Sequence, residues 1–565
     1  MKLMFRKVFT AAFIIFLFPV FVLNSFAFSD LSGHWAEEVI IKWADKEVVR
    51  GLPDGTFRPD AYITRAEFVT VLNNVMKYVN KSDEKFNDVS ENDWFAENVA
   101  KAVAAGVTVG TGSGGFGPSN LITRQEAAVM IYRAFRMQVK DRNAADKYSD
   151  AGQIASWAKD AVSALTENGY VSGRPGNRFA PLDNITRAEA LKIIDNILGY
   201  IVNTPGGYTG EIEKSLLVNT GDVTLKDMLI DGSLYLSEGV DDGTVVLDGV
   251  TVRGDVFVLG GGEGGIILKN TVVEGTMQVM KYDGKAGIVA EGSTEVKNIL
   301  VLSGVKLREE NVTAAGFGNI RVISLKQGEK TVLDGVFDEV ELNTEGAGII
   351  IENGSVAALN IGSDAYGTLV EIAENAEVNT MLIGASATVK GNGSVKNAEI
   401  KADQVSIEMI PENYRIYKGF TANIGGTETT GDYVPEEETA AKIEPTVIYL
   451  SISGQRVDGI FTGNGSAEID LAGYDNSDRV EFIKIDAVPQ DAVLKITSVN
   501  GIPFELEIAG IDEKITVASL LGSDNDSISL GTIRGVFGSI VTIKGTLSKS
   551  GYDSLDVNLT IKLGE

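Results

Sequence analysis

The amino-acid sequence predicts a multidomain protein with three parts: an all-α region of three helix-loop-helix repeats, a parallel β-solenoid of the right-handed β-helix kind, and an all-β immunoglobulin-like sandwich. Three observations carry this prediction. The hexapeptide ITRAEF at 63–68 returns as ITRQEA at 122–127 and ITRAEA at 185–190, the spacing of a supersecondary unit. Short β-branched runs then recur every 21 or 22 residues. Alternating strands follow an acidic, proline-bearing linker.

Residues 1–27 have the pattern of a secretory signal peptide. Lys2, Arg6 and Lys7 precede an apolar run, and small residues end at Ala27, where we expect cleavage. An uncleaved membrane anchor is the alternative, and we expect no integral membrane contact from the mature protein. The formal net charge of −28 argues against nucleic acid as a partner, because phosphate neutralisation needs clustered Lys and Arg. Cysteine is absent, so stability has to come from packing.

Each repeat opens with an aromatic residue, an aspartate two positions later, and then a tryptophan. The repeats are expected over 28–80, 86–140 and 148–200; the aspartates are Asp30, Asp88 and Asp150, and the tryptophans are Trp35, Trp94 and Trp157. A helix-like run follows each tryptophan, and we expect it to end at Gly51, Gly106 and Gly169, because a left-handed residue often closes a helix. A Gly/Pro/Asn-rich loop then leads to the recurrent motif.

The motif is typical of a helix start. A threonine is followed three residues later by a glutamate, which is the spacing of a capping box: Thr64 and Glu67, Thr123 and Glu126, Thr186 and Glu189. Apolar residues at helical spacing follow each pair, as at Phe68, Val71, Leu72 and Val75. Each unit is therefore predicted to be helix, loop, helix.

This assignment gives no structural role to the arginine of each motif. Arg65, Arg124 and Arg187 lie in a first helical turn, where a cation opposes the helix dipole. One interpretation is a solvated charge or a salt bridge to a nearby glutamate. The other is a carboxylate site made by the guanidinium beside free helix amides. On the second interpretation the arginine is exposed, and Arg65→Ala should hardly change stability. The tryptophans are similarly ambiguous between core residues and platforms for a sugar ring.

These features resemble those of S-layer homology domains, and the resemblance covers 28–198 of the chain. It implies a pseudo-threefold arrangement that binds secondary cell-wall polysaccharide, commonly carrying pyruvate ketals, in grooves between repeats. The aspartates, tryptophans and arginines named above become groove candidates on this resemblance. The second repeat has the loop GTGSGGFGPSN in place of the charged residues of the first, and the third has its tryptophan seven residues after its aspartate. We therefore expect one or two competent grooves.

Residues 206–426 are predicted to form the solenoid, with about nine coils ending near 410. The segments starting at 223, 245 and 266 align, with Gly232, Gly254 and Gly275 in register. A meander of hairpins is the alternative. Solenoids host polysaccharide-degrading enzymes, but the only histidine, His34, lies in the first repeat. Asp241 and Asp242 read as a turn, whereas glycoside chemistry needs two carboxylates held apart across a cleft.

Residues 427–446 are expected to be a linker, and 447–565 the sandwich. Asp524 and Asp526 in GSDNDS could bind Ca²⁺, but the full ligand pattern is missing and a plain turn is favoured. We expect no cofactor.

The favoured hypothesis is a non-enzymatic protein of the cell wall and surface of a Gram-positive-type bacterium. Its expected partner is secondary cell-wall polysaccharide on peptidoglycan, and its β-rich ectodomain would serve as an S-layer-like or adhesive element, through self-assembly or contact with a host or substrate surface. The rival hypothesis is an anchored polysaccharide lyase or hydrolase acting through the solenoid.

Overall fold

The computed structural model describes residues 28–434, except 113, 283, 285 and 327, and the strands of 441–563 with short gaps between them. The chain divides into two compact units at the boundary between Tyr433 and Val434. The first unit contains the three repeats and the solenoid, and the second contains the C-terminal sheets. The proposed signal peptide lies outside the described residues, as does the segment GSDNDS.

The three repeats are helical, as the sequence predicts. Each contributes two α-helices, and the third adds short 3₁₀ turns. The helices are α1 Glu37–Asp45, α2 Arg65–Met76, α3 Ala96–Ala104, α4 Arg124–Ala134, α5 Lys159–Glu167 and α6 Arg187–Ile197; the 3₁₀ turns are η1 Ala144–Lys147, η2 Ala151–Gln153 and η3 Ser156–Ala158. Their apolar faces share one core, which includes Trp43, Phe68, Ile131 and Ile194.

The ends of the first helices depart in one place from expectation. Gly106 and Gly169 follow α3 and α5 in the left-handed conformation, with φ of 70° and 69°. In the first repeat the same position is held by Glu47, with φ of 58°. Gly51 instead faces the ring of Phe28, where an added Cβ would come within 2.3 Å of a ring carbon. The glycine at 51 is therefore needed for close packing, and its expected role as the end of α1 is wrong.

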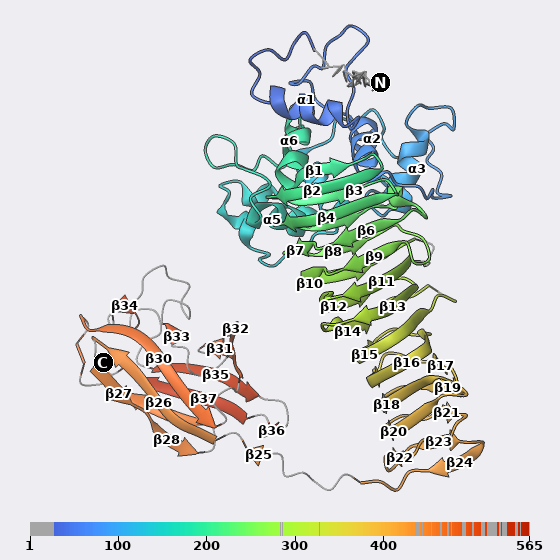
Figure 1. Ribbon diagram of the computed structural model, residues 1–565. Helices are drawn as coiled ribbons and strands as arrows, with labels where there is room; N and C mark the ends of the chain where they lie inside the picture. Colours follow the sequence, from blue (N-terminus) through green and yellow to red (C-terminus); the bar gives the residue numbers. More distant parts are fainter. Residues whose placement is uncertain are drawn as a thin grey trace, which may run out of the picture. The chain divides into compact units, whose positions relative to one another are not determined.

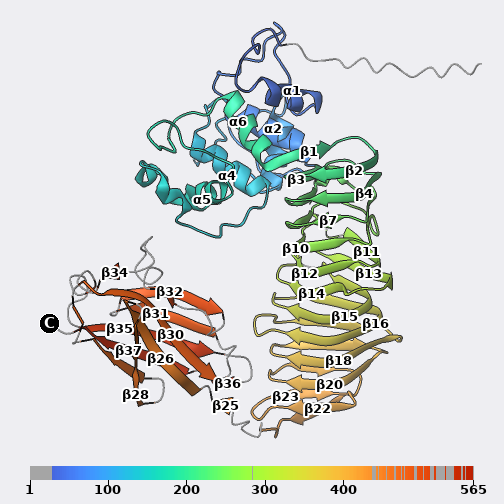
Figure 2. The ribbon, with the colours of Figure 1, turned by 60° about the vertical axis from the view of Figure 1, so that its left-hand side comes forward.

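The solenoid begins directly where α6 ends. Figures 1 and 2 show its strands stacked from β1 at the helical end to β22–β24 at the other. The strands are β1 Leu198–Val202, β2 Gly206–Ile212, β3 Ser215–Val218, β4 Val223–Ile230, β5 Leu234–Leu236, β6 Val245–Asp248, β7 Thr251–Val252, β8 Val256–Val258, β9 Ile266–Lys269, β10 Val272–Val279, β11 Ala286–Gly292, β12 Glu295–Val301, β13 Val305–Val312, β14 Gly316–Val322, β15 Thr331–Leu342, β16 Gly348–Ile361, β17 Thr368–Ile372, β18 Ala376–Ile383, β19 Ala387–Gly391, β20 Ser394–Ile400, β21 Val405–Ile407, β22 Asn413–Ile416, β23 Thr421–Ile424 and β24 Thr427–Thr430; η4 is Glu238–Val240.

Successive coils pair in parallel, which confirms the solenoid and rejects the meander. Residues at equivalent positions stack into inward columns, one of which runs through Leu216, Leu234, Val256, Met277, Ile299, Ile320, Val340, Leu359, Met381 and Ala398. All of these side chains are buried. Because coils repeat at the strand spacing of about 4.8 Å, each column is a continuous apolar stack. The right-handed sense of the solenoid stays a prediction.

The solenoid is longer than the sequence indicated. It has about 11 turns, against the expected nine. Its last coil closes with an antiparallel pair between β23 and β24, followed by a bridge between Tyr417 and Tyr433. Residues 427–430, expected in the linker, therefore form the final strand, since polar Thr and Glu side chains suit an exposed edge.

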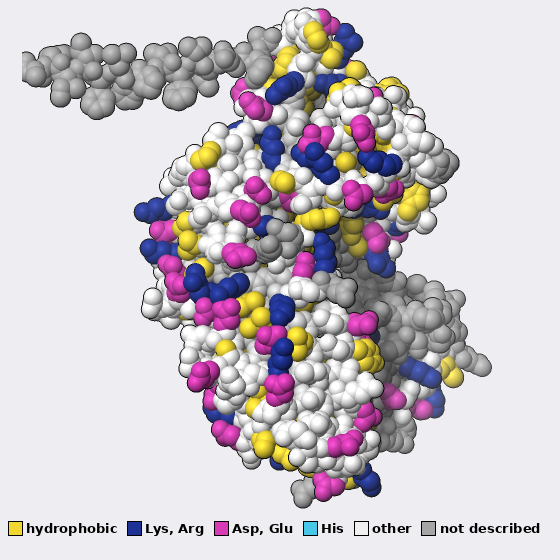
Figure 3. Space-filling view, turned by 90° about the vertical axis from the view of Figure 1, so that its right-hand side faces the viewer, with side chains coloured by type: hydrophobic (Ala, Val, Ile, Leu, Met, Phe, Trp, Pro, Cys, Tyr) yellow, Lys and Arg dark blue, Asp and Glu magenta, His cyan; other side chains and the backbone are white. Residues whose placement is uncertain are grey.

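Charged side chains of both signs lie on the outside of the coils. One outward column alternates Lys226, Asp248, Lys269 and Glu291 on successive rungs. Figure 3 shows Lys and Arg interspersed with Asp and Glu over one face of the protein. Opposite charges on adjacent rungs are favourable cross-strand neighbours.

The described residues of the C-terminal unit lie mainly in β-strands, as predicted. They are β25 Ala441–Lys442, β26 Glu444–Ile452, β27 Gln455–Asp458, β28 Ile460–Gly463, β29 Ser466–Asp470, β30 Arg479–Val488, β31 Val493–Val499, β32 Ile502–Ala509, β33 Ile515–Thr516, β34 Ile528–Ser529, β35 Ile540–Ser548, β36 Tyr552–Asp553 and β37 Leu555–Lys562. One sheet has the order β27-β26-β30-β33, with β34 also on β30, and another has β28-β29-β37-β35-β31-β32. The immunoglobulin-like type stays a prediction.

The glycines at the start of the solenoid allow the close contact between successive coils to be tested. A Cβ on Gly254 would lie 2.7 Å from the backbone of Gly232 in the preceding coil. We expect Gly254→Ala to lower the free energy of unfolding by about 1 to 3 kcal/mol, the usual effect of overpacking. Gly207→Ala is the matched control, because no atom lies within 4 Å of its added Cβ. Urea unfolding followed by the β-sheet signal measures both, and equal midpoints would contradict the expectation.

Candidate functional site

The three motifs meet at the centre of the helical region. The backbone amide of Ile63 donates to the carbonyl of Ile185, Ile185 to Ile122, and Ile122 to Ile63, over 3.0 to 3.1 Å. The three hydrogen bonds form a closed ring, and all three side chains are buried. The repeats are therefore joined cyclically, with the third contacting the first directly.

The threonines and glutamates of the motifs form the capping boxes. In each case the threonine hydroxyl accepts from the glutamate backbone amide, and the glutamate side chain accepts from the threonine amide. The next amides of α2, α4 and α6 donate to the loop of another repeat. For example, Arg65 N and Ala66 N donate to Asn120 O and Pro118 O. The free first-turn amides that an anion site would require are thus already occupied.

The motif arginines are largely buried, which corrects the expectation that they are exposed without a structural role. Arg65 is 5% exposed; its Nε donates to Phe116 O at 3.1 Å and its Nη1 to Glu126 at 3.3 Å. Arg124 makes the equivalent contacts with Phe179 O and Glu189. The physical reason is that the next repeat's loop closes over the first turn, and a buried guanidinium needs several acceptors.

Arg187 completes this set across the ring. Its Nε donates to Phe57 O at 3.0 Å, its Nη2 donates to Arg50 O, and its Nη1 lies 3.6 Å from Glu67. Each arginine also lies over the ring of the phenylalanine whose carbonyl it binds, at 4.5 to 5.2 Å. Burial lowers the pKa of Arg65, Arg124 and Arg187. Arginine nevertheless stays protonated, so each remains a fixed positive charge between repeats.

The aspartates hold the loops that receive these arginines. Asp88 accepts from the amides of Phe116 at 2.7 Å and Gly117 at 2.8 Å. Asp30 accepts from Phe57 and Arg58, and Asp150 from Phe179 and Ala180. The phenylalanine peptide is therefore bound on its amide side by an aspartate of its own repeat and on its carbonyl side by an arginine of another.

The tryptophans are on the surface. Trp35, Trp94 and Trp157 are 60%, 65% and 58% exposed, whereas Trp43 is buried in the core. Because burial of an indole is strongly favourable, three exposed tryptophans at equivalent positions indicate a surface contact role.

Two grooves bring a tryptophan and an arginine of different repeats together. The repeat-3 groove, about 310 Å³, is lined by Trp35, Arg124, Tyr170, Val171, Ser172, Gly173, Arg174, Pro175, Glu189, Lys192, Ile193 and Asn196. The repeat-1 groove, about 510 Å³, is lined by Glu47, Val48, Val49, Arg50, Gly51, Leu52, Glu67, Thr70, Val71, Asn74, Lys77, Trp94 and Arg187. Each groove thus has walls from all three repeats.

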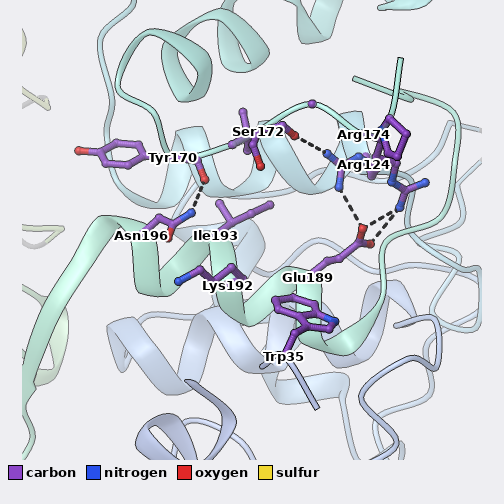
Figure 4. Close-up of a pocket in the computed structure, with 12 residues that line it drawn as sticks. Trp35, Arg124, Tyr170, Ser172, Arg174, Glu189, Lys192, Ile193 and Asn196 are labelled. Carbon is purple, nitrogen blue, oxygen red and sulfur yellow. Dashed lines mark hydrogen bonds and ion pairs between the residues drawn. The ribbon is translucent and has the colours of Figure 1, made fainter. Parts of the chain in front are cut away.

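Figure 4 shows how charges are arranged in the repeat-3 groove. Glu189 lies between Trp35 on one side and Arg124 and Arg174 on the other. Arg174 Nη2 donates to Glu189 at 2.8 Å, and its Nη1 donates to Asp183 at 2.6 Å. The groove combines an apolar ring with two guanidinium groups and a nearby ammonium, Lys192. Such a set can hold an anionic, ring-shaped ligand.

Several groove residues were missed from the sequence. Arg174 and Arg50 lie in the loops between paired helices, and Lys77, Lys192 and Asn196 lie on or after the second helices. The loop cations could have been noticed, because residues 107–121 of the second repeat contain no Lys or Arg at all. The aspartates, expected in grooves, are absent from the linings of both grooves.

Comparison with known proteins agrees with this arrangement. The S-layer homology domain family matches residues 27–69, 85–128 and 147–191. The chain carries three S-layer homology (SLH) domains. Among its relatives are an amylopullulanase of Thermoanaerobacterium thermosulfurigenes, 36% identical over 30% of this chain and 9% of that protein, and the surface-layer 125 kDa protein of Lysinibacillus sphaericus, 28% identical over 35% of this chain and 17% of that protein.

The exoglucanase XynX of Acetivibrio thermocellus is 35% identical over 31% of this chain and 16% of its own length. The chain thus covers less than a fifth of each of these relatives, and the matches to the amylopullulanase and the exoglucanase fall in the SLH region. The SLH domains and surface-layer relatives indicate a cell-surface protein anchored to the cell wall. Among the described residues, no helix is long and apolar enough to cross a membrane.

Removing a motif arginine should destabilise the SLH region. Arg65→Ala removes the guanidinium that donates to Phe116 O and Glu126 Oε1, and we expect a loss of about 2 to 3 kcal/mol, typical of hydrogen bonds to charged groups. The control is Lys85→Ala, because the Lys85–Glu91 pair is exposed and such pairs contribute below about 1 kcal/mol. Urea unfolding followed by helical circular dichroism compares them. A loss no larger than that of the control would show that Arg65 is dispensable to the fold.

The loop aspartates predict acid sensitivity. Hydrogen bonds from Phe116 and Gly117 hold the pKa of Asp88 below its ordinary value. A lowered folded-state pKa stabilises the protein above the unfolded pKa of about 3.9, and this contribution is lost as the pH falls through the folded value. Asp88→Asn should therefore be less stable than the parent at pH 7, with the difference shrinking in acid. Urea midpoints at pH 7 and pH 3 measure this, and a gap that does not change with pH would contradict it.

Proposed function

We propose that this protein binds secondary cell-wall polysaccharide through its SLH grooves and displays the solenoid and C-terminal sheets as a non-enzymatic S-layer-like or adhesive element. The observation that carries the proposal is the pairing of an exposed tryptophan with a fixed arginine in two grooves between repeats. The indole offers a flat apolar face to a sugar ring. The cations offer partners for an acidic substituent of that sugar, such as a pyruvate ketal.

The burial of the arginines changes how they would serve this function. Arg124 and Arg187 are already bound by carbonyl and carboxylate groups, so they supply positive potential at the groove floor and hold the walls together. Direct contact with a carboxylate falls better to Lys192 in the repeat-3 groove, where Arg174 is itself paired with Glu189 and Asp183, and to Arg50 and Lys77 in the repeat-1 groove. By analogy with the other two grooves, Trp157 would share a groove with the loop of repeat 2, and residues 107–121 of that loop contain no Lys or Arg. This favours two binding grooves over three.

A second candidate is an anchored enzyme that degrades polysaccharide, since relatives named amylopullulanase, exoglucanase and endoglucanase carry similar SLH regions. The amylopullulanase and exoglucanase matches lie in the anchor, whereas the endoglucanase match, 27% identical, spans 300 residues, or 51% of this chain. In the solenoid, Asp242 is paired with Lys281 at 2.9 Å, and Asp241 occupies a left-handed turn position. This pair of neighbouring turn residues suits structure better than catalysis. New reducing ends or unsaturated uronates after incubation of the full chain with anionic polysaccharides would favour the enzyme.

The binding proposal is tested with the full chain and purified walls. We expect retention on walls that carry the secondary polymer and loss of retention after hydrofluoric acid removes it. Trp35→Ala and Trp94→Ala together should weaken binding by about tenfold or more, or ~1.4 kcal/mol. Tyr366→Ala is the control, because this solenoid tyrosine has a similar exposure of 57%. Retention on stripped peptidoglycan, or an unaffected double variant, would overturn the proposal.

A further inference from the structure

The first coils of the solenoid pack into the core of the SLH repeats. Leu217, Tyr235 and Phe257 stand on successive rungs and point outward, yet all three are buried. The Tyr235 and Phe257 rings are stacked 4.7 Å apart, and Tyr235 Oη donates to Phe135 O at 3.1 Å. Farther along the same column the residues become polar, with Arg321 and Glu341. The solenoid is thus apolar on its outside where the SLH repeats cover it.

Solenoid side chains also satisfy the C-terminal ends of both helices of repeat 1. The last carbonyls of a helix have no partner within it. Asn219 Nδ2 donates to Val75 O at 2.8 Å at the end of α2, and Asn203 Nδ2 donates to Lys46 O at 3.0 Å at the end of α1. In repeat 2 the carbonyl equivalent to Lys46 O is that of Ala105, which binds Arg136 of the same repeat. At the end of its first helix, repeat 1 therefore depends on the solenoid where repeat 2 does not, whereas the second helix of repeat 2 is also bound by the solenoid, through Tyr235 on Phe135 O.

The chain after α2 is held in the same way. Glu238, in η4 of the solenoid, accepts from the amides of Val79 at 3.0 Å and Asn80 at 3.4 Å. At neighbouring Gly239 an added Cβ would lie 2.4 Å from the Cβ of Lys77, so the two segments are in close contact. Lys77 ends α2 in the left-handed conformation, with φ of 53° and its amide on Asn73 O, and so turns the chain toward this contact.

These contacts adjoin the repeat-1 groove. Glu47 and Lys77 line that groove, each one or two residues from a carbonyl or amide bound by the solenoid. Because the backbone after Lys77 is bound by Glu238 and Lys77 itself contacts Gly239, the path of the chain that carries the Lys77 ammonium depends on contacts outside the SLH repeats. We propose that Asn203, Asn219 and Glu238 are positioning residues for the repeat-1 groove. Through them the solenoid contributes to the binding of the cell wall. This inference rests on the proposed binding function.

The test compares the triple variant Asn203→Ala/Asn219→Ala/Glu238→Gln with the parent in the full chain, first without polymer. Hydrogen exchange should speed up over residues 46–52 and 73–81, because the bound amides and helix ends lose their partners. Glu238→Gln alone, which keeps the side-chain shape, should show the effect over 77–81. Glu295→Gln, on another strand of the solenoid, is the control. Unchanged exchange in both segments would overturn the inference, whatever the binding results.

Binding to purified walls then shows which of the two grooves the variant affects. In a Trp35→Ala background, which leaves the repeat-1 groove intact, the triple variant should lose affinity by about fivefold or more. In a Trp94→Ala background, which leaves the repeat-3 groove, it should bind like its parent. Equal losses in both backgrounds would mean general destabilisation and would overturn the positioning role. If the unmodified protein fails to bind walls, the proposed function falls, and the hydrogen exchange result alone decides whether the solenoid holds the groove residues in place.

Discussion

The closed ring of hydrogen bonds among Ile63, Ile122 and Ile185 is the constraint on which the helical region depends. It joins residues about 60 to 120 positions apart, so it forms only when all three repeats are folded together. Around it each helix start is inserted into the loop of another repeat, with amides, arginine and phenylalanine in fixed contact. The grooves exist only between repeats, and a repeat taken alone has none of them.

This arrangement explains why charged side chains of the motif are buried in a protein of high net negative charge. An isolated buried guanidinium is strongly unfavourable, but each motif arginine has a backbone carbonyl, a partly buried carboxylate and an aromatic face. The aspartate on the far side of the same peptide keeps the carbonyl in place. Loop, helix cap and arginine thus form one hydrogen-bonded network, in which loss of any member leaves another without a partner.

The solenoid adds a second constraint, because its first and last coils have no further coil to pair with and must be covered in another way. At one end the outward column of Leu217, Tyr235 and Phe257 is covered by the SLH core, and at the other the antiparallel strand β24 closes the last coil. Direct continuation of α6 into β1 leaves no linker between the SLH region and the first coil. The base of the solenoid and the SLH repeats thereby form one packed unit.

The sequence by itself determined the local elements, because capping boxes, helical periodicity and the 22-residue strand period are interactions among near neighbours. It placed Thr64 with Glu67, predicted the helix pairs and identified the parallel solenoid. Only the tertiary structure decided the fate of Arg65, Arg124 and Arg187, since their acceptors lie 43 to 137 residues away on other repeats. The same is true of Asn219 and Glu238, whose partners are about 140 to 160 positions distant. The sequence shows that these arginines recur but not which distant groups they meet, so their burial and pairing could be read only from the folded protein.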